Sequence, residues 1–300
     1  MMAAMRDIPL RGEMRLDEPL ARHTSWRVGG PAKRFYRPAD SADLVAFLRQ
    51  CDADEPLFWL GLGSNLLVRD GGFNGTVIAV QGCLERLELR KDALLYAEAG
   101  LSCARVARFA ARQGRVGIEF LAGIPGTMGG ALAMNAGAFG GETWRSVAWV
   151  ETVDRCGNVR RRMPESFSVG YRQVDGLNGE WFLGAALATV QGDVAAGQQR
   201  IRALLAQRAE SQPIGLPSCG SVFRNPAGDH AARLIEACGL KGMRIGGAVV
   251  SAKHANFIIN SDQASAADIE ALITLVHDRV AAEQGVQLQP EVHILGESEQ

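Results

Sequence analysis

The segment that most restricts the fold of this chain is a glycine-rich run at residues 121–142, LAGIPGTMGGALAMNAGAFGGE. It contains seven glycines and no Lys or Arg, so it has few side chains with which to build a core of its own. Glycine lets a backbone approach a ligand closely. The run therefore predicts either a bed for a flat or phosphorylated ligand or a tight crossing between packed elements. A second glycine loop, GLGSN at residues 61–65, favours one elongated ligand.

The composition is that of a globular chain without a nucleic-acid or membrane surface. Its 300 residues suggest two domains, and 47% of them are hydrophobic, which is enough for a large core. The net charge of -1 argues against a nucleic-acid-binding face or a polybasic membrane patch. No apolar run approaches the ~18 residues of a membrane span, and the N-terminus lacks the apolar centre of a signal peptide. We therefore expect a cytoplasmic protein.

The six cysteines read as free thiols. None forms a CxxC pair, and no group of Cys and His has the spacing of a zinc site. Unpaired cysteines are typical of a reducing compartment. We expect no metal ion.

Apolar periodicity continues along the chain, which argues against disorder and predicts both helices and strands. Residues 1–22 are polar and read as an irregular lead-in. We expect Ser41 to cap a helix. Further expected helices are at 102–113, within 127–137, at about 195–209, at 231–240 and after 265; expected strands include 56–61, a hairpin around 156–158, and a final strand within 286–295. A composition shift near Gly192 places the domain boundary there, giving domains of residues 1–192 and 193–300.

Neither glycine loop matches a common nucleotide-binding fingerprint. Gly61 and Gly63 are followed by Leu66 where the dinucleotide fingerprint has a third glycine, and by a β-rich run in place of a helix. A Walker A sequence is absent as well. The loop can still hold a pyrophosphate, because successive backbone N–H groups in a turn bind anions. Ser64 and Asn65 add side-chain donors.

Seven motifs, taken together, identify a family resemblance. In chain order they are HTSWRVGG, LGLGSNLLVRDGGFNGTVI, EFLAGIPGTMGGALAMNAGAFGGE, FSVGYR, PSCGSVFRNP, KHANFIIN and QPEVHILG. Between residues 23 and 296 they closely resemble the UDP-N-acetylenolpyruvoylglucosamine reductases, which are flavoproteins of bacterial peptidoglycan synthesis. Because the last third has little room for insertions, the chain resembles the shorter form of the family, which lacks an extra substrate-side loop.

The resemblance implies an α+β fold and a reaction. Residues 1–192 would form an FAD-binding domain of the vanillyl-alcohol-oxidase (PCMH) type, and residues 193–300 a smaller α+β domain that binds substrate. Electrons from NADPH, the co-substrate, would pass through non-covalently bound FAD to the enolpyruvyl double bond, giving UDP-N-acetylmuramate. The partners would be small molecules only, and the protein a monomer.

Three residues match the catalytic positions of the family. Arg172 in GYR would hold the substrate carboxylate with its planar guanidinium. Ser221 in GSVF would protonate a substrate carbon, and Glu291 in QPEV would support the enolate. Without the resemblance, these residues are more often a surface charge, a turn residue and a solvated edge residue. Cys219 reads as a small buried thiol, because no carbonyl-transfer machinery accompanies it.

The remaining candidate site residues form two sets. Those for FAD lie in or near the glycine-rich loops: Gly29, Gly61, Gly63, Ser64, Asn65, Leu66, Gly123, Ile124, Pro125, Gly126, Thr127, Gly129, Gly130, Asn135, Ala136 and Gly137. Those for the anionic substrates are basic or amide side chains of the last third: Arg208, Arg224, Asn225, Lys253, His254 and Asn256. Lys253 and His254 could equally be a helix-end or surface pair.

Two other functions stay open. One is another FAD-dependent oxidase or dehydrogenase of the same fold. Many such oxidases tether FAD through a His that follows paired glycines, whereas Pro31 follows Gly29 and Gly30 here, so that tether is missing. The other is a nucleotide-binding or interaction module without activity, which leaves the ordered set of catalytic candidates as coincidence.

Overall fold

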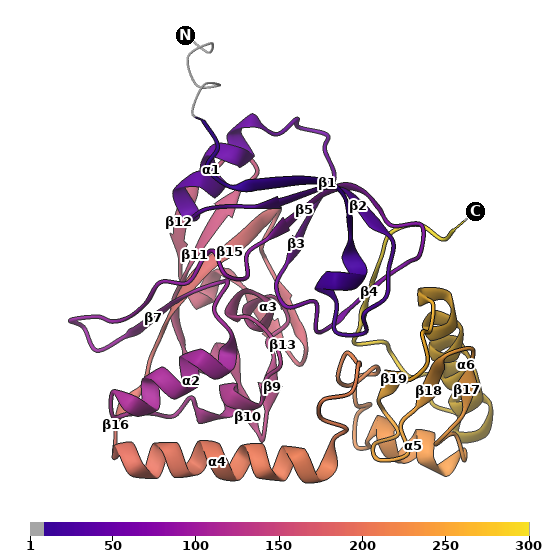
Figure 1. Cartoon of the computed structure of the whole chain (residues 1–300). Coiled ribbons are helices and arrows are strands. Elements are labelled where there is room, and N and C mark those ends of the chain that lie inside the picture. The colour runs from indigo at the N-terminus through magenta and orange to yellow at the C-terminus, as the bar shows by residue number, and fades with distance from the viewer. Residues whose placement is uncertain (1–8, 300) are drawn as a thin grey trace. The chain divides into compact units, whose positions relative to one another are not determined.

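The computed structural model describes residues 9–299, which divide into two compact units (Figure 1). The first unit contains residues 9–15, 35–61 and 75–206, and the second contains residues 16–34, 62–74 and 207–299. Both units combine helices with strands, so the expected α+β class is confirmed. None of the helices described is both long enough and apolar enough to span a membrane.

The first unit is built mainly from strands. Its helices are α1 (Ser41–Gln50), α2 (Cys103–Arg112), η2 (Glu119–Gly123), α3 (Met128–Ala133), η3 (Thr143–Ser146) and η4 (Pro164–Ser166), and α4 (Val194–Ser211) begins in it. Its strands are β3 (Leu57–Leu60), β6 (Leu87–Leu89), β7 (Leu95–Glu98), β8 (Arg115–Val116), β9 (Gly137–Ala138), β10 (Gly141–Glu142), β11 (Val147–Asp154), β12 (Val159–Arg162), β13 (Ser168–Gly170), β14 (Gln173–Asp175), β15 (Glu180–Leu187) and β16 (Val190–Gln191).

The second unit is smaller and holds the C-terminal elements. These are α5 (Ala231–Ala237), β17 (Arg244–Ile245), β18 (Ala248–Val250), β19 (Ile258–Asn260), α6 (Ala266–Gln284) and β20 (His293–Leu295), together with η1 (Leu20–His23) and β4 (Leu66–Val68).

Three further strands, β1 (Glu13–Pro19), β2 (Pro31–Arg37) and β5 (Phe73–Ala79), form a sheet with β3 in the order β1-β2-β5-β3.

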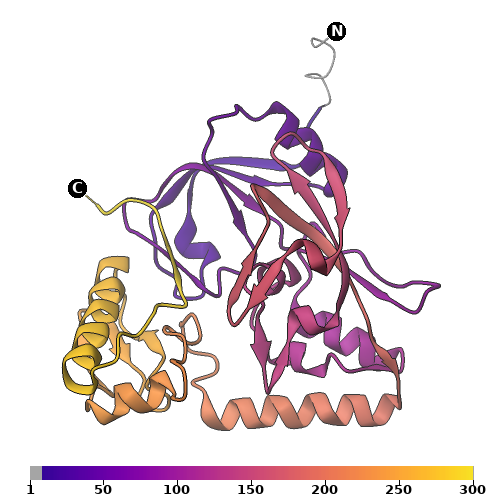
Figure 2. The same ribbon diagram turned by 180° about the vertical axis from the view of Figure 1, so that it is seen from behind.

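A five-stranded antiparallel sheet organises the first unit. Its order is β12-β11-β15-β7-β6, and its long strands β11 and β15 lie side by side in the view from behind (Figure 2). β11 and β12 form the predicted hairpin, in which Val153 pairs with Val159. The buried residues of α2, η2 and α3 cover part of this sheet in one apolar cluster that includes Leu101, Val106 and Leu132.

The helix ends follow local capping chemistry. Ser265 and Asp268 form the predicted capping box of α6, and Gly285 ends that helix with φ 67°. Ser102 caps α2. Our expectation for α1 was wrong by one residue, because the side chain of Asp40, rather than Ser41, accepts from the backbone N–H of Asp43 at 2.9 Å.

In the second unit, α6 packs on the sheet β17-β18-β19 and contacts α5 (Figure 1). The predicted apolar stripe of α6, from Ile269 to Val280, is buried in this core. The expected final strand is much shorter than predicted: only β20 forms, and it pairs in parallel with β4. Glu291 lies just before β20, and the loop Leu62–Asn65 just before β4, so this pairing brings two predicted motifs together.

Candidate functional site

The predicted site residues divide between the two units. The first unit holds Arg172 and the cofactor candidates Gly61, Gly123, Ile124, Pro125, Gly126, Thr127, Gly129, Gly130, Asn135, Ala136 and Gly137. The second holds Ser221, Glu291, the cofactor candidates Gly29, Gly63, Ser64, Asn65 and Leu66, and the six substrate candidates.

The glycine-rich run is anchored like a strand along the segment that precedes α2. The backbone N–H of Cys103 donates to the carbonyl of Gly126 at 2.9 Å, and that of Gly129 donates to Ala99 at 2.9 Å. Thr127 is buried, caps α3, and its hydroxyl accepts from Gly130. The start of α3 is therefore fixed by backbone bonds to Ala99 and Cys103 and by the Thr127 side chain.

The glycines of this run serve two purposes. A Cβ at Gly123, Gly137 or Gly141 would collide with Phe139, the Gly141 carbonyl or Phe120, so packing explains these three. A Cβ at Gly130 would meet nothing nearer than the hydroxyl of Thr127 at 3.8 Å. Packing thus accounts for these three glycines but not for Gly130, where the predicted ligand bed stays a prediction.

Gly61, at the end of β3, faces Thr127. A Cβ on residue 61 would lie 2.5 Å from the Thr127 hydroxyl oxygen. The absence of a side chain at this position lets the end of β3 pack directly against the buried Thr127.

Arg172 lies in the two-residue turn of the β13–β14 hairpin. Its φ of 55° is uncommon for a residue with a side chain, and the hairpin pairs Gly170 with Gln173. The guanidinium donates to the carbonyl of Gly137 at 3.0 Å and to that of Asn135 at 3.4 Å. The arginine is therefore held against the second half of the glycine-rich run.

Asn135 joins the same two segments through its side chain. Its amide donates to the carbonyl of Gly170 at 3.0 Å and accepts from the backbone N–H of Trp144 at 3.2 Å. Its own φ is 44°, and the residue is buried. Strained backbone at two contacting residues is typical of a functional site.

In the second unit, the GLGSN loop lies against Glu291. The amide of Asn65 donates to the Glu291 carbonyl at 2.9 Å, and the backbone N–H of His293 donates to the Asn65 carbonyl at 3.0 Å. Gly63, with φ 58°, approaches the backbone of His23 and accepts from the backbone N–H of Ser25 at 3.0 Å.

Ser221 directly precedes Val222, the residue whose backbone bonds to Glu291. The N–H of Glu291 donates to the carbonyl of Val222 at 2.7 Å, and Phe223 bridges to Pro290. Ser221 itself is partly exposed. The side chain of Cys219, two residues earlier, is buried and donates to the Leu66 carbonyl at 3.3 Å. Burial raises the pKa of the Cys219 thiol to about 12, which keeps it neutral.

Two of the six substrate candidates have buried nitrogen atoms without a partner. Nε of Arg224 and Nδ1 of His254 make no hydrogen bond among the residues that the structure describes. Burial lowers the pKa of the His254 imidazole, and the nearby Lys241 ammonium lowers it further. Buried polar atoms are normally paired, and Nε1 of Trp59 and Nε of Arg155 are the other buried side-chain nitrogens of this kind among the described residues.

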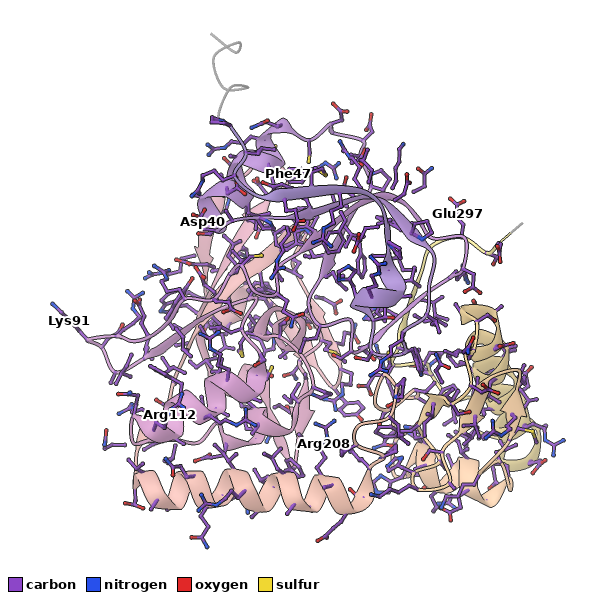
Figure 3. The ribbon with its side chains drawn as sticks, in the orientation of Figure 1. Asp40, Phe47, Lys91, Arg112, Arg208 and Glu297 are labelled. Atoms are coloured by element: carbon purple, nitrogen blue, oxygen red, sulfur yellow. The ribbon has the colours of Figure 1, made fainter. Side chains whose placement is uncertain are left out.

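The other four substrate candidates bond within the chain. Nζ of Lys253 donates to the Ala209 carbonyl at 2.6 Å, and Arg208, on the last turn of α4 (Figure 3), donates to Gln212 at 2.8 Å. Burial lowers the pKa of the Arg208 guanidinium. The side chain of Asn225 accepts from the first N–H of α5 at 3.1 Å. Both sides of the Asn256 amide contact the backbone of Phe223.

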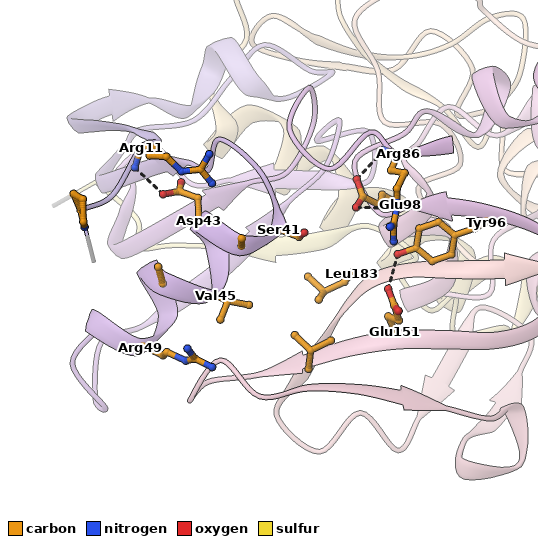
Figure 4. Close-up of a pocket in the computed structure, with 14 residues that line it drawn as sticks. Arg11, Ser41, Asp43, Val45, Arg49, Arg86, Tyr96, Glu98, Glu151 and Leu183 are labelled. Carbon is orange, nitrogen blue, oxygen red and sulfur yellow. Dashed lines mark hydrogen bonds and ion pairs between the residues drawn. The ribbon is translucent and has the colours of Figure 1, made fainter. Parts of the chain in front are cut away.

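A cavity of about 460 Å³ in the first unit contains none of the predicted site residues (Figure 4). Charged groups in its wall are paired with one another or with neighbours. The backbone N–H of Arg11 donates to Asp43 at 2.7 Å, and the Tyr96 hydroxyl donates to Glu151 at 2.5 Å. Because these charged groups are paired within the protein, a structural role explains their presence in the cavity wall.

Comparison with known proteins defines the class first. A model described as an FAD binding domain matches residues 32–162, and one described as UDP-N-acetylenolpyruvoylglucosamine reductase, C-terminal domain, matches residues 212–295. With the α+β fold, these matches make the chain an FAD-dependent oxidoreductase.

Individual relatives then identify the family. The UDP-N-acetylenolpyruvoylglucosamine reductase of Alkalilimnicola ehrlichii is 64% identical over 100% of both chains, and that of Methylococcus capsulatus is 63% identical over 99% of this chain and 98% of its own length. The crystal structure of the reductase from Thermus caldophilus has a TM-score of 0.82 at 33% identity, over 95% of this chain and 99% of that one. This chain therefore belongs to the UDP-N-acetylenolpyruvoylglucosamine reductase family, and the predicted resemblance and FAD cofactor are confirmed.

Proposed function

We propose that this protein reduces the enolpyruvyl ether of UDP-N-acetylglucosamine enolpyruvate to UDP-N-acetylmuramate, with NADPH as electron donor, in peptidoglycan precursor synthesis. The chemistry that FAD supplies when bound is the transfer of a hydride from NADPH to one carbon of the enolpyruvyl double bond. One hydride and one proton are added overall, so the protein must stabilise an enolate and then protonate its carbon.

Three side chains are assigned to these tasks. Arg172 holds the substrate carboxylate, because a guanidinium binds carboxylate oxygens through two parallel N–H donors. Glu291, protonated or sharing a proton, donates to the enolate oxygen. The Ser221 hydroxyl gives its proton to the carbanion carbon, which is a strong enough base to take it.

The observation that carries the proposal is the hydrogen-bonded meeting of three motifs in the second unit. A backbone bond joins the N–H of Glu291 of QPEV to the carbonyl of Val222 of GSVF at 2.7 Å, and the Asn65 amide of GLGSN donates to the backbone carbonyl of Glu291 at 2.9 Å. These bonds place the backbone of Glu291 next to the residue that follows Ser221, and they support the assignment of both residues to one site.

The donor set suits FAD and an anionic substrate. Gly130 leaves an uncovered backbone position on α3 in the first unit, and we assign it to FAD with the other cofactor candidates named above. Arg224 and His254 are assigned to the substrate phosphates, since each has an unpaired buried nitrogen. We further propose that residues 1–192 act as the FAD-binding domain and residues 193–300 as the substrate-binding domain, in a cytoplasmic monomer.

Anaerobic stopped-flow mixing tests this function. The purified yellow protein is mixed first with NADPH and then with UDP-N-acetylglucosamine enolpyruvate, while flavin absorbance is followed. We expect bleaching in the first step and full recovery only with the enolpyruvyl substrate, accompanied by UDP-N-acetylmuramate. Recovery with UDP-N-acetylglucosamine alone, or bleaching by a hydroxy acid in place of NADPH, would point to a different flavin enzyme.

A further inference from the structure

The segment Val222–Arg224 lies between two other segments of the second unit. On one side, the N–H of Arg224 donates to the Gln289 carbonyl at 2.9 Å, and the Val222 carbonyl accepts from Glu291 at 2.7 Å. On the other side, Val222 and Phe223 are hydrogen-bonded to one residue, Asn256. Ser221 immediately precedes this segment, so its backbone position depends on both sides.

Asn256 takes the place of a neighbouring strand. Its backbone carbonyl accepts from the N–H of Val222 at 2.9 Å. Its side-chain oxygen accepts from the N–H of Phe223 at 2.9 Å, and its side-chain nitrogen donates to the carbonyl of Phe223 at 2.8 Å. One residue thus makes three hydrogen bonds to two consecutive residues.

This contact requires a side-chain amide, and it is shielded from water. Asn256 is 3% exposed and Phe223 is 1% exposed, so water cannot replace a missing partner. A carboxylate has no N–H to donate to the Phe223 carbonyl, and an aliphatic side chain offers neither group. Because both ends of the amide are bonded to Phe223, the side chain has little left to offer a substrate.

We infer that Asn256 is a positioning residue: it fixes the backbone of Val222–Phe223 and thereby sets the placement of Ser221 and Glu291 relative to each other. This inference rests on the proposed roles of those two residues. A displacement of about 1 Å in a reacting group can slow catalysis roughly 10²-fold. Loss of the hydrogen bonds from Asn256 to Val222 and Phe223 should therefore lower the rate directly.

The test is Asn256→Asp in the FAD-loaded protein. This variant keeps the size and the acceptor of asparagine but loses the donor to the Phe223 carbonyl. We expect flavin reduction by NADPH to stay within about 2-fold of wild type, and flavin reoxidation by the enolpyruvyl substrate to slow about 10–100-fold at saturation, with little change in the substrate concentration at half-maximal rate. Hydrogen exchange in the substrate-free protein gives a second readout: peptides that contain residues 221–224 should exchange faster.

Asn260→Asp is the matched control. Asn260 also bonds backbone at both ends of its amide, donating to Trp26 at 2.9 Å and accepting from Ala264 at 2.9 Å, but it does not contact residues 221–224 through these bonds. It should lose stability without a selective effect on reoxidation. Asn256→Ser, with the same readouts, replaces the aspartate variant if that variant does not fold.

The outcomes separate this inference from the proposed function. A wild-type protein whose reduced flavin is not reoxidised by the enolpyruvyl substrate contradicts the proposed function itself. If wild type reacts but Asn256→Asp only needs more substrate, with an unchanged limiting rate and unchanged exchange, Asn256 is a substrate contact. Equal losses in both half-reactions, matched by Asn260→Asp, would reduce its role to general stability. Either result overturns the inference.

Discussion

The guanidinium of Arg172 donates to the backbone carbonyl of Gly137 at 3.0 Å, which ties the tip of the β13–β14 hairpin to the glycine-rich run. Asn135 strengthens this tie by donating from its side chain to Gly170 at 3.0 Å. The proposed carboxylate clamp is thus oriented by the same segment that is assigned to FAD. A guanidinium has five N–H donors, so it can serve backbone carbonyls and a substrate carboxylate together.

Arg172→Lys should slow reoxidation by the enolpyruvyl substrate roughly 10²-fold or more, because a lysine keeps the charge but loses the planar fork. Flavin content and flavin reduction by NADPH should be unchanged. Stopped-flow measurement of each half-reaction checks this. Arg162→Lys is a suitable control, since Arg162 pairs with Glu180 at 3.1 Å in the sheet and has no assigned part in the reaction. Near-normal reoxidation in Arg172→Lys would remove Arg172 from the role of clamp.

Gly130→Ala separates a ligand bed from a packing site. The added Cβ would meet no protein atom closer than 3.8 Å, and alanine favours a helix by about 1 kcal/mol over glycine, so the apoprotein should be as stable as wild type or more so. If FAD lies on this surface, flavin affinity should nevertheless fall by roughly 10-fold for each ~1.4 kcal/mol of lost contact. Flavin titration and thermal unfolding of the apoprotein measure the two effects.

Gly129→Ala gives the opposite pattern and serves as the comparison for Gly130→Ala. Its Cβ would lie 3.0 Å from the Cβ of Ala99, so Ala99 would have to shift, and this apoprotein should be less stable than the Gly130→Ala apoprotein. A Gly130→Ala protein that loses stability but binds FAD normally would show that this residue is also a packing glycine.

The sequence predicted the elements whose signals are local. The capping box and apolar stripe of α6, and the hairpin that pairs Val153 with Val159, depend on residues close together in the chain. Strand β1 was missed within a region expected to be irregular, because only Glu18 of Glu13–Pro19 is buried and no apolar face marks the strand. The first eight residues of that expectation lie outside the described part of the chain.

The site was less accessible to sequence reasoning, because it depends on long-range backbone pairing. The final strand was expected to include Gln289–Glu291, but these residues bond to Val222 and Arg224 instead. Nothing local reports a contact across more than sixty residues. In the same way, Gly123 and Gly130 are indistinguishable as letters, and only the neighbouring Phe139 makes the first a packing glycine.

Asp43→Asn should destabilise the protein in a pH-dependent way. Burial raises the pKa of the Asp43 carboxyl, but hydrogen bonds from the Arg11 N–H, the Tyr36 hydroxyl and the Ala39 N–H outweigh burial and leave the pKa below its ordinary value. A carboxyl with a lowered folded-state pKa stabilises the fold above its unfolded pKa, near 3.9, and loses that contribution as the pH falls.

We therefore expect Asp43→Asn to lose about 1.5–3 kcal/mol at pH 7 in urea unfolding, and the deficit relative to wild type to shrink below about pH 4. Asp40→Asn is the control. Asp40 is the N-cap of α1, and asparagine caps a helix about as well as aspartate; its exposed ion pair with Arg11 contributes only about 0–1 kcal/mol, so its effect should be small. A deficit for Asp43→Asn that does not change with pH would mean that shape, rather than charge, makes Asp43 important.

Ser221→Ala should separate the two half-reactions. Hydride transfer from NADPH to FAD needs no proton on the substrate carbon, so flavin reduction should stay close to wild type. Reoxidation by the enolpyruvyl substrate should slow by roughly 10²–10⁴-fold, the usual loss for a missing general acid, or about 3–5 kcal/mol in the barrier. Cys219 is the nearest alternative proton donor in the sequence. Its thiol is buried and donates to the Leu66 carbonyl at 3.3 Å, and burial raises the pKa of the thiol to about 12.

Cys219→Ala should therefore leave both half-reactions near wild type. If reoxidation stays fast in Ser221→Ala and becomes slow in Cys219→Ala, the proton comes from the thiol, and the assignment of Ser221 is wrong.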